Sequence, residues 1–539
     1  MSDQQRQCPA REHLQEQGEQ VLFRVPAPAH SDQLIMIITN SDTVPGIHHH
    51  VSKCLRLLEH YEWLINSFVL DFFHEEHWQT LPQSWQQFLG NVSPLELAIW
   101  LDSENSSQPT SNKVWPLSLL ALKHTLRSLS LPRRPVTDLM EVAKQLKIKT
   151  NDNEDRLWQF DPELMSGGSK HHESLKHVFR KHVKPKKQYE MCRLGKLSSS
   201  VARSVKNVNK ILDIGSGVGH LSRYLCYNHN MTVACVDGDD NLTVSARKFD
   251  EELEKAVEKM KKRSLDNDDQ ELELPPAPVH VTCHISPDMN LDSFHGLLRE
   301  NFHLTNNDKS MLEYGLVGLH TCGDLAPVIL RMFTQDPASV MLNSLGCCYM
   351  KIKQHFPMSR HVSDCTWHEL TYTSTELACH AIEVYRERLR NDNNNNNGDD
   401  DVSECNKLKV HCYRAVLEYL LIRRNVKYRH TILKSVPKSH LLPFPEYAKK
   451  ATVNLVNEGM EAFTDDELDN DDVHDMLKQW WKVVIFYTIR LSFAPVIETV
   501  ILLDRCLFLH EHGSESVMFP LFDPILSPRN QVIVAVKTP

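Results

Sequence analysis

A glycine-rich turn near the middle of the chain reads DIGSGVGH and follows the apolar run KIL. Glycine permits sharp turns and lets the backbone approach a ligand that a Cβ would exclude. The helix predicted after the turn begins with free N–H groups, which favour polar or anionic ligand atoms. We therefore expect this turn to bind a cofactor through six residues: Asp213, Gly215, Ser216, Gly217, Gly219 and His220.

The spacing of the glycines distinguishes between two classes of cofactor. A dinucleotide fingerprint requires glycine at the last position of G-x-G-x-x-G, and His220 occupies that position. The D-x-G-x-G-x-G form suits S-adenosylmethionine, whose carboxylate and amine lie against such a loop. Asp237 ends the next predicted strand, 232–236, where a carboxylate can accept hydrogen bonds from both ribose hydroxyls. Asp288, after the third strand, either accepts from the adenine amino group or is an exposed loop acid.

Polar side chains follow the fourth and fifth predicted strands, in the segments HTCGD and NSLGCCY. Ligands of open α/β sheets bind at the carboxyl ends of the strands. We therefore expect these side chains to face the substrate that would accept the methyl group of S-adenosylmethionine. The candidate catalytic residues are His320, Asp324 and Asn343. An acceptor with a high pKa, such as a ribose hydroxyl, needs a base. His320 is either that base or a rim histidine held by backbone groups.

Cys322, Cys347 and Cys348 lie in the same two segments. With His320 they offer thiolate and imidazole groups, which are suitable zinc ligands. Consecutive side chains at the end of a strand point in opposite directions, however, so Cys347 and Cys348 are not expected to share one ion. We therefore predict no metal site and interpret the cysteines as packing residues beside the cofactor.

The elements around these motifs indicate an α/β fold. Apolar strands alternate with helical segments from about residue 208 to residue 346, a pattern typical of a parallel sheet with crossover helices. The predicted parts are a disordered N-terminus (1–30), a helical N-terminal region (31–165), a cofactor-binding core (166–375), a helical insertion (376–510) with a disordered Asn/Asp-rich loop (391–405), and a closing β-hairpin (511–539).

Five segments in order are similar to the methyltransferase-like protein 25 family, which includes relatives once named for a ribosomal RNA adenine dimethylase domain. They are KKQYEMCRLGKL, ILDIGSGVGHLSRYL, GLHTCGDLAP, NSLGCCYMK and LFDPILSPRN. The resemblance implies a Rossmann-like, seven-strand class I methyltransferase sheet flanked by helices, with S-adenosylmethionine as cofactor. It also implies a cofactor contact by Lys187 and Glu190. The H-x-C-G and paired-cysteine segments are more distantly similar to transfer RNA 2′-O-methyltransferases.

The distribution of charge bears on the methyl acceptor. The net charge is −10, yet the stretch Lys170–Lys210 is strongly basic. A basic stretch next to the cofactor loop favours contacts with phosphates, so we predict an S-adenosylmethionine-dependent methyltransferase that acts on RNA. Two alternatives stay open, namely a methyltransferase for a basic protein and a catalytically inactive cofactor-binding scaffold.

The composition is that of an ordinary globular protein, with 41% hydrophobic and 24% charged residues. No uninterrupted apolar run reaches the ~18–20 residues of a membrane span, and the first residues lack an apolar signal core. The 14 cysteines include no C-x-x-C pair, which favours reduced thiols. We therefore expect a cytoplasmic or nuclear protein without a membrane partner.

Overall fold

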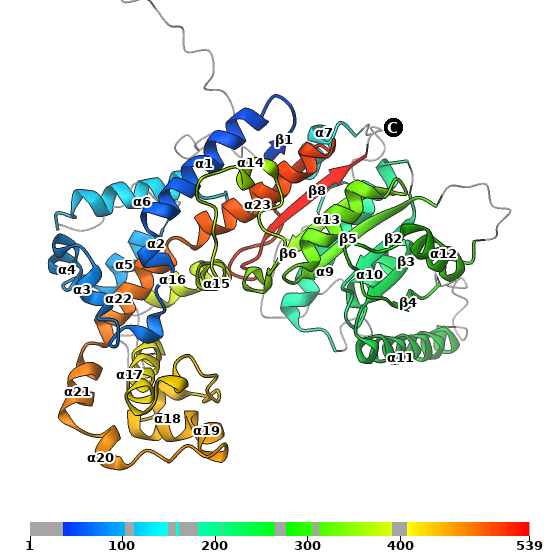
Figure 1. Cartoon of the computed structure of the whole chain (residues 1–539). Coiled ribbons are helices and arrows are strands. Elements are labelled where there is room, and N and C mark those ends of the chain that lie inside the picture. Colours follow the sequence, from blue (N-terminus) through cyan, green and yellow to red (C-terminus); the bar gives the residue numbers. More distant parts are fainter. Residues whose placement is uncertain are drawn as a thin grey trace, which may run out of the picture.

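A twisted sheet of eight strands, in the order β1-β7-β8-β6-β5-β2-β3-β4, forms one side of the molecule (Figure 1). The computed structural model describes residues 36–102, 113–148, 158–160, 182–206, 208–264, 276–304, 312–390 and 407–537. The strands are β1 (Ile37–Thr39), β2 (Lys210–Ile214), β3 (Thr232–Asp237), β4 (Val279–Thr282), β5 (Tyr314–Thr321), β6 (Ser339–Gly346), β7 (Ser516–Pro520) and β8 (Gln531–Val536).

The five strands from β2 to β6 pair in parallel. The side chains of β2, β3, β5 and β6 are almost continuously buried because helices cover both faces of the sheet. One face packs against α7 (Met140–Gln145), α9 (Pro185–Ser204) and α10 (His220–His229). The other face packs against α12 (Leu291–Asn301), α13 (Leu325–Gln335) and α23 (Ala494–Glu511). The predicted Rossmann-like α/β class is therefore confirmed.

The sheet has one strand more than the seven that the sequence predicts. β7 and β8 form the predicted antiparallel C-terminal hairpin, and β8 also pairs antiparallel with β6. The additional strand, β1, pairs antiparallel with β7 and comes from the region expected to be helical. A three-residue strand carries too little alternation to be recognised in sequence, and tertiary pairing with β7 creates it.

Helices from two distant parts of the chain form one body beside the sheet (Figure 1). The N-terminal helices are α1 (Val44–His60), α2 (Glu62–Ile65), α3 (His77–Thr80), α4 (Gln83–Leu89), α5 (Pro94–Leu101) and α6 (Leu117–Leu129). The later helices are α14 (Arg360–Ser363), α15 (Tyr372–Leu377), α16 (Ile382–Arg390), α17 (Lys409–Arg424), α18 (Phe444–Ala451), α19 (Val453–Asn457), α20 (Asp465–Leu468), α21 (Asp471–Lys478) and α22 (Trp480–Leu491). The two groups share one hydrophobic core.

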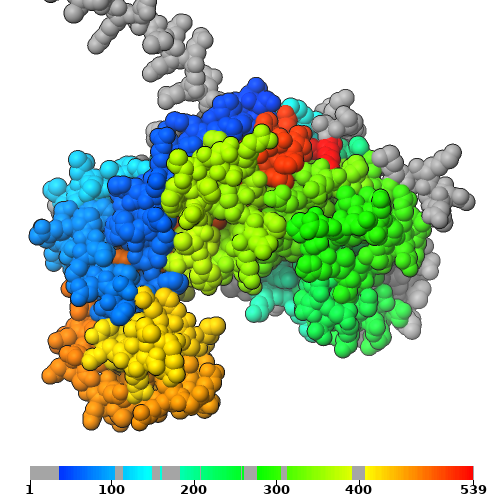
Figure 2. All heavy atoms as spheres, in the orientation of Figure 1, coloured from blue at the N-terminus to red at the C-terminus, as the bar shows by residue number. Residues whose placement is uncertain are grey.

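Helices α17 to α21 form a lobe that stands away from the sheet (Figure 2). α11 (Asp240–Ser264) instead flanks β3 and β4.

The stretch Trp480–Glu511, which joins α22 and α23, is long and apolar enough by composition to cross a membrane. In this fold, 94% of its most apolar window is buried inside the protein. α23 contacts β1, β7 and α13, so it is the crossover helix between β6 and β7. The predicted disordered segments, 1–30 and 391–405, lie outside the described residues.

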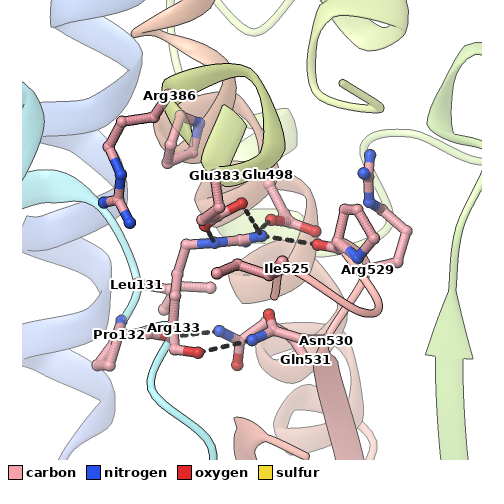
Figure 3. Close-up of polar contacts among 12 residues, drawn as sticks. Leu131, Pro132, Arg133, Glu383, Arg386, Glu498, Ile525, Arg529, Asn530 and Gln531 are labelled. Carbon is pink, nitrogen blue, oxygen red and sulfur yellow. Dashed lines mark hydrogen bonds and ion pairs between the residues drawn. The ribbon is translucent and has the colours of Figure 1, made fainter. Parts of the chain in front are cut away.

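Arg133 joins the N-terminal region, the later helices and the C-terminal hairpin (Figure 3). Its guanidinium forms ion pairs with Glu383 on α16 and Glu498 on α23, and it donates to the Pro528 carbonyl at 2.7 Å. The Asn530 side-chain amide donates to the Arg133 carbonyl at 2.7 Å. The three charged side chains are nearly buried, with 12%, 8% and 6% of their surfaces exposed. This cluster fixes the loop between β7 and β8 to the helical body.

Candidate functional site

Glycines in the left-handed conformation shape the turn between β2 and α10. The φ angles of Gly215, Gly217 and Gly219 are +70°, +57° and +71°, which residues with a Cβ rarely adopt. The Ser216 carbonyl closes the turn by accepting from the Gly219 N–H at 3.0 Å. A Cβ on Gly217 would meet nothing within 4 Å, so the backbone borders open space at this point.

Asp237 ends β3 beside this turn, because β2 and β3 pair in register through Ile214 and Val236. The Gly217 N–H donates to one carboxylate oxygen of Asp237 at 2.8 Å, and the Asp239 N–H donates to the other at 2.9 Å. Each oxygen has a second lone pair, so Asp237 can still accept hydrogen bonds from a ligand. The structure therefore brings together the two features on which the predicted cofactor site depends.

A cleft of about 440 Å³ opens beside Asp237, within the ~300–1,000 Å³ typical of small-molecule sites. Its wall comes from β2, β3, the loop after β4, α13 and the loop after β6: Ile214, Gly215, Val236, Asp237, Gly238, Cys283, His284, Ile285, Ser286, Pro287, Asp324, Leu325, Val328 and His355. Isoleucine, leucine and valine side chains give part of this wall an apolar surface that suits a planar ring.

The loop after β4 lines the cleft through residues that sequence reasoning missed. Asp288 was the candidate on this loop, but it is exposed and follows the lining residue Pro287 without joining the wall. Ile285 and Ser286 of the same loop do line the cleft. The sequence did contain a signal for these lining residues. The whole loop follows a predicted parallel strand, and ligands bind at the carboxyl ends of such strands.

Asp213 and His220 lie beneath the glycine turn and outside the cleft wall. Asp213 accepts from the Ser222 hydroxyl at 2.6 Å, and burial raises the pKa of Asp213 to about 6 despite this bond. Burial lowers the pKa of His220 to about 3, and the Arg223 guanidinium adds to that effect. The two side chains therefore support the turn and the start of α10 from below.

His320 and Glu190 form a hydrogen-bonded pair at the carboxyl end of β5. Glu190, on α9, accepts from His320 Nε2 at 2.8 Å and from the Ser527 hydroxyl at 2.6 Å. Burial alone would raise the pKa of Glu190, but its bonds with His320 and Ser527 lower the pKa below its ordinary value. Because the ionised Glu190 carboxylate accepts a hydrogen bond from Nε2–H, the proton of the neutral His320 ring lies on Nε2. Nδ1 is then the ring nitrogen that can accept a proton. The family resemblance implied a cofactor contact for Glu190, and its bonds with His320 and Ser527 were not predicted.

Lys187 lies on the first turn of α9, three residues before Glu190. Its ammonium favours the charged form of Asp213, which places it close to the glycine turn. The side chain is half-buried. A direct contact between Lys187 and the cofactor remains a prediction.

The other two catalytic candidates have different surroundings. Asp324 lines the cleft, and its carboxylate accepts from the Lys353 N–H at 3.1 and 3.2 Å and from the Gln354 N–H at 3.4 Å. It thereby fixes the loop that carries His355. Asn343 lies within β6, is completely buried and donates to the Ser198 hydroxyl at 2.9 Å. The expectation that Asn343 lies on the rim is therefore wrong, because β6 continues beyond it to Gly346.

Three cysteine thiols meet at the ends of β5 and β6. The Sγ atom of Cys322 lies 3.2 Å from that of Cys347 and 3.4 Å from that of Cys348, and the latter two are 3.5 Å apart. β6 ends at Gly346, so the alternation of a strand no longer applies to the paired cysteines. The reason for expecting Cys347 and Cys348 to diverge was therefore wrong. The contact between Cys322 and Cys347 lowers the pKa of Cys322 and raises the pKa of Cys347, so Cys322 is the thiol of this pair that loses its proton more readily.

The basic stretch is only partly a free surface in the residues that the structure describes. Arg193 is buried and donates to the carbonyls of Leu521 and Val136 at 2.6 and 2.8 Å. Arg203 donates to a backbone carbonyl, and Lys206 pairs with Glu313 at 2.8 Å. Several of these charges therefore stabilise the fold. Residues 170–181 of the stretch lie outside the described residues.

Comparison with known proteins agrees with this geometry. Residues 186–355 match the model of a family described as a methyltransferase domain. The chain is 30% identical over 233 residues to a Mus musculus protein named probable methyltransferase-like protein 25, a match covering 41% of this chain and 37% of the relative. A Homo sapiens protein of the same name is 29% identical over 252 residues, covering 41% and 36%. The chain thus spans little more than a third of these relatives' length. No solved structure matches it significantly.

Proposed function

We propose that the methyltransferase domain of this chain, which is related to methyltransferase-like protein 25, binds S-adenosylmethionine and catalyses methyl transfer. One observation carries the proposal: the Gly217 N–H donates to the Asp237 carboxylate, and Asp237 lines an open cleft together with Gly215 of the same turn. The family match supports the reaction class, and the form of the glycine turn supports this cofactor.

The residues of the cleft fit the chemical parts of S-adenosylmethionine. The open space at Gly217 lets a ligand lie against the backbone of the turn. Asp237 suits a ribose diol, because its oxygens retain acceptor capacity. The apolar side chains of Ile285 and Leu325 suit the faces of an adenine ring. When bound, this cofactor supplies an electrophilic methyl group on a sulfonium.

The protein's own contribution is to position the acceptor and to accept its proton. A methyl acceptor must lie in line with the leaving sulfur, so a rigid rim at the carboxyl ends of β5 and β6 favours transfer. His320 lies on this rim, and the buried Glu190 holds its ring through Nε2. The Nδ1 atom of His320 is then available to take a proton from a hydroxyl acceptor.

We expect Asp237→Ala to weaken binding of S-adenosylmethionine by about 1.5–3 kcal/mol, the range for hydrogen bonds to a charged group. Isothermal titration calorimetry measures the change. Asp239→Ala is a suitable control, because Asp239 lies two residues further along and is exposed. Equal affinity in Asp237→Ala and the unmodified chain would contradict the proposed ribose contact.

We expect His320→Ala to lower the initial rate of methyl incorporation by about 10²-fold while the cofactor Kd changes little. Glu190 acts through His320 and is a positioning residue. Glu190→Gln should therefore change the pH profile of the rate, because a neutral amide stabilises protonated His320 less than a carboxylate does. An unchanged rate in His320→Ala would show that the acceptor needs no base from this residue.

We further propose RNA as the methyl acceptor. The exposed Lys184 precedes Lys187 at the start of α9, the helix whose Glu190 meets His320 at the carboxyl end of β5. Lys186 is also exposed, and its ammonium lies 3.5 Å from the Glu190 carboxylate. Phosphate contacts there should make RNA affinity fall steeply as salt concentration rises. Filter binding over a salt series, with Lys184→Glu beside the unmodified chain, tests this. A flat response to salt would contradict an RNA acceptor and favour a protein substrate.

A further inference from the structure

We propose that Cys322, Cys347 and Cys348 form a zinc site whose fourth coordination position is open to an exogenous ligand. Their three Sγ atoms form a triangle with edges of 3.2, 3.4 and 3.5 Å. Each atom thus lies in contact with both others, although the residues come from two different strand ends. Among the described residues, these three cysteines form a group whose ligand atoms lie close enough together to hold one metal ion.

The dimensions of the triangle suit a thiophilic ion after a small movement. Zn²⁺ binds thiolates at ~2.3 Å in tetrahedral geometry, which separates neighbouring sulfurs by about 3.8 Å. The observed separations are a few tenths of an ångström shorter, and small side-chain rotations open the triangle to that size. A disulfide would use only two of the three thiols, so the symmetric arrangement favours metal coordination.

The backbone beneath the triangle fixes its position. Gly323 takes φ +57°, and a Cβ there would lie 2.6 Å from the Lys351 carbonyl oxygen. Glycine permits this close approach of the turn after β5 to the 3-10 helix Tyr349–Lys351, and Thr321 pairs with Gly346 where the two strands end. The turn with Cys322 and the turn with the paired cysteines therefore stay together without a bound ion.

Two cationic side chains lie near the triangle. The Arg505 guanidinium is buried beside Gly346, and its charge neighbours include Cys347. The Lys351 ammonium interacts electrostatically with Cys322 and Cys348. Three thiolates with one Zn²⁺ carry a net charge of −1, which complements this positive environment.

Three protein ligands leave one zinc coordination position for water or a substrate atom. The cysteines are partly exposed, and His320 precedes Cys322 by two residues at the end of β5. The open position thus lies on the rim where the acceptor of the proposed reaction is expected. The proposed contacts with S-adenosylmethionine lie at the ends of β2 and β3, so binding of this cofactor should persist when the metal is removed.

The test uses the full chain, reduced and then loaded with Zn²⁺ in competition with a chromogenic chelator. We expect one zinc per chain, protection of three thiols from alkylation, and loss of that protection on adding EDTA. Replacement of Zn²⁺ by Co²⁺ should produce a thiolate-to-cobalt charge-transfer band. S-adenosylmethionine titration before and after EDTA distinguishes failure of this site from failure of the proposed function.

Cys322→Ser, Cys347→Ser and Cys348→Ser should each weaken zinc affinity at least tenfold. Cys365→Ser is the matched control, because Cys365 is also partly exposed but lies after α14. Circular dichroism shows whether each variant is folded. Absence of zinc binding by the folded chain would overturn the proposal, as would equal affinity in all four variants. Peptide mapping before reduction that finds two of these three cysteines linked, with a mass two hydrogens lower, would assign the cluster to a disulfide and overturn the proposal.

Discussion

Gly217→Arg is expected to reduce affinity for S-adenosylmethionine by at least ~10²-fold, or about 2.7 kcal/mol. The backbone at Gly217 borders open space, so an arginine side chain would extend into the region that the cofactor needs. Its φ of +57° also disfavours a residue with a Cβ. Calorimetric titration of the purified variant measures the loss.

Gly459→Arg provides a matched control for this substitution. Gly459 also has positive φ, at +99°, and a Cβ there also meets nothing within 4 Å, but it lies after α19 in the helical lobe. It carries the same change in charge, size and backbone strain. Full binding by Gly459→Arg with none by Gly217→Arg supports the cleft as the cofactor site. Undiminished binding by Gly217→Arg would contradict it.

Arg133→Met is expected to lower the free energy of unfolding by about 3–5 kcal/mol, because it leaves buried charges without their partner. The carboxylates of Glu383 and Glu498 both pair with this guanidinium and are less than 10% exposed. Denaturant unfolding followed by circular dichroism measures the change. The neighbouring Arg134 is exposed, so Arg134→Met should change stability by less than ~0.5 kcal/mol.

A triple variant separates lost charge compensation from lost packing at Arg133. Arg133→Met combined with Glu383→Gln and Glu498→Gln removes all three charges, so most of the lost stability should return. If Arg133→Met unfolds within ~1 kcal/mol of the unmodified chain, the buried cluster contributes little to stability.

The glycine turn and its neighbouring aspartate were predictable because their signal is local. A strand, a glycine turn and a helix follow each other within residues 210–229, and Asp237 needs only the next strand to reach them. The C-terminal hairpin was predictable for the same reason, since β7 and β8 are joined by a short loop with Pro and Asn. Patterns of this kind require no knowledge of distant contacts.

Features that depend on distant contacts were not predictable. β1 exists through its pairing with β7, almost 480 residues later in the chain. Glu190 meets His320 across 130 residues, and Ser527 meets Glu190 across 337. Asn343 was misplaced because the sequence did not reveal where β6 ends. The meeting of Cys322 with the paired cysteines depends on that same strand end.

The charge pattern shows a further limit of sequence reasoning. A count of lysines and arginines cannot distinguish a solvent-exposed cation from one bound inside the fold. Arg193 illustrates this, because its guanidinium donates to two buried carbonyls although it lies in the most basic stretch. The exposed Lys184 is therefore a better position than Arg193 for testing RNA binding.

Transfer of a labelled methyl group tests the proposed activity most directly. The purified chain is incubated with tritiated S-adenosylmethionine and total cell extract, with or without RNase, beside Gly217→Arg as the blank. We predict acid-insoluble label that depends on the unmodified chain and disappears with RNase. Label that resists RNase but is lost to protease would replace RNA by a protein acceptor. Label no greater than the Gly217→Arg blank would contradict methyl transfer and favour a cofactor-binding scaffold.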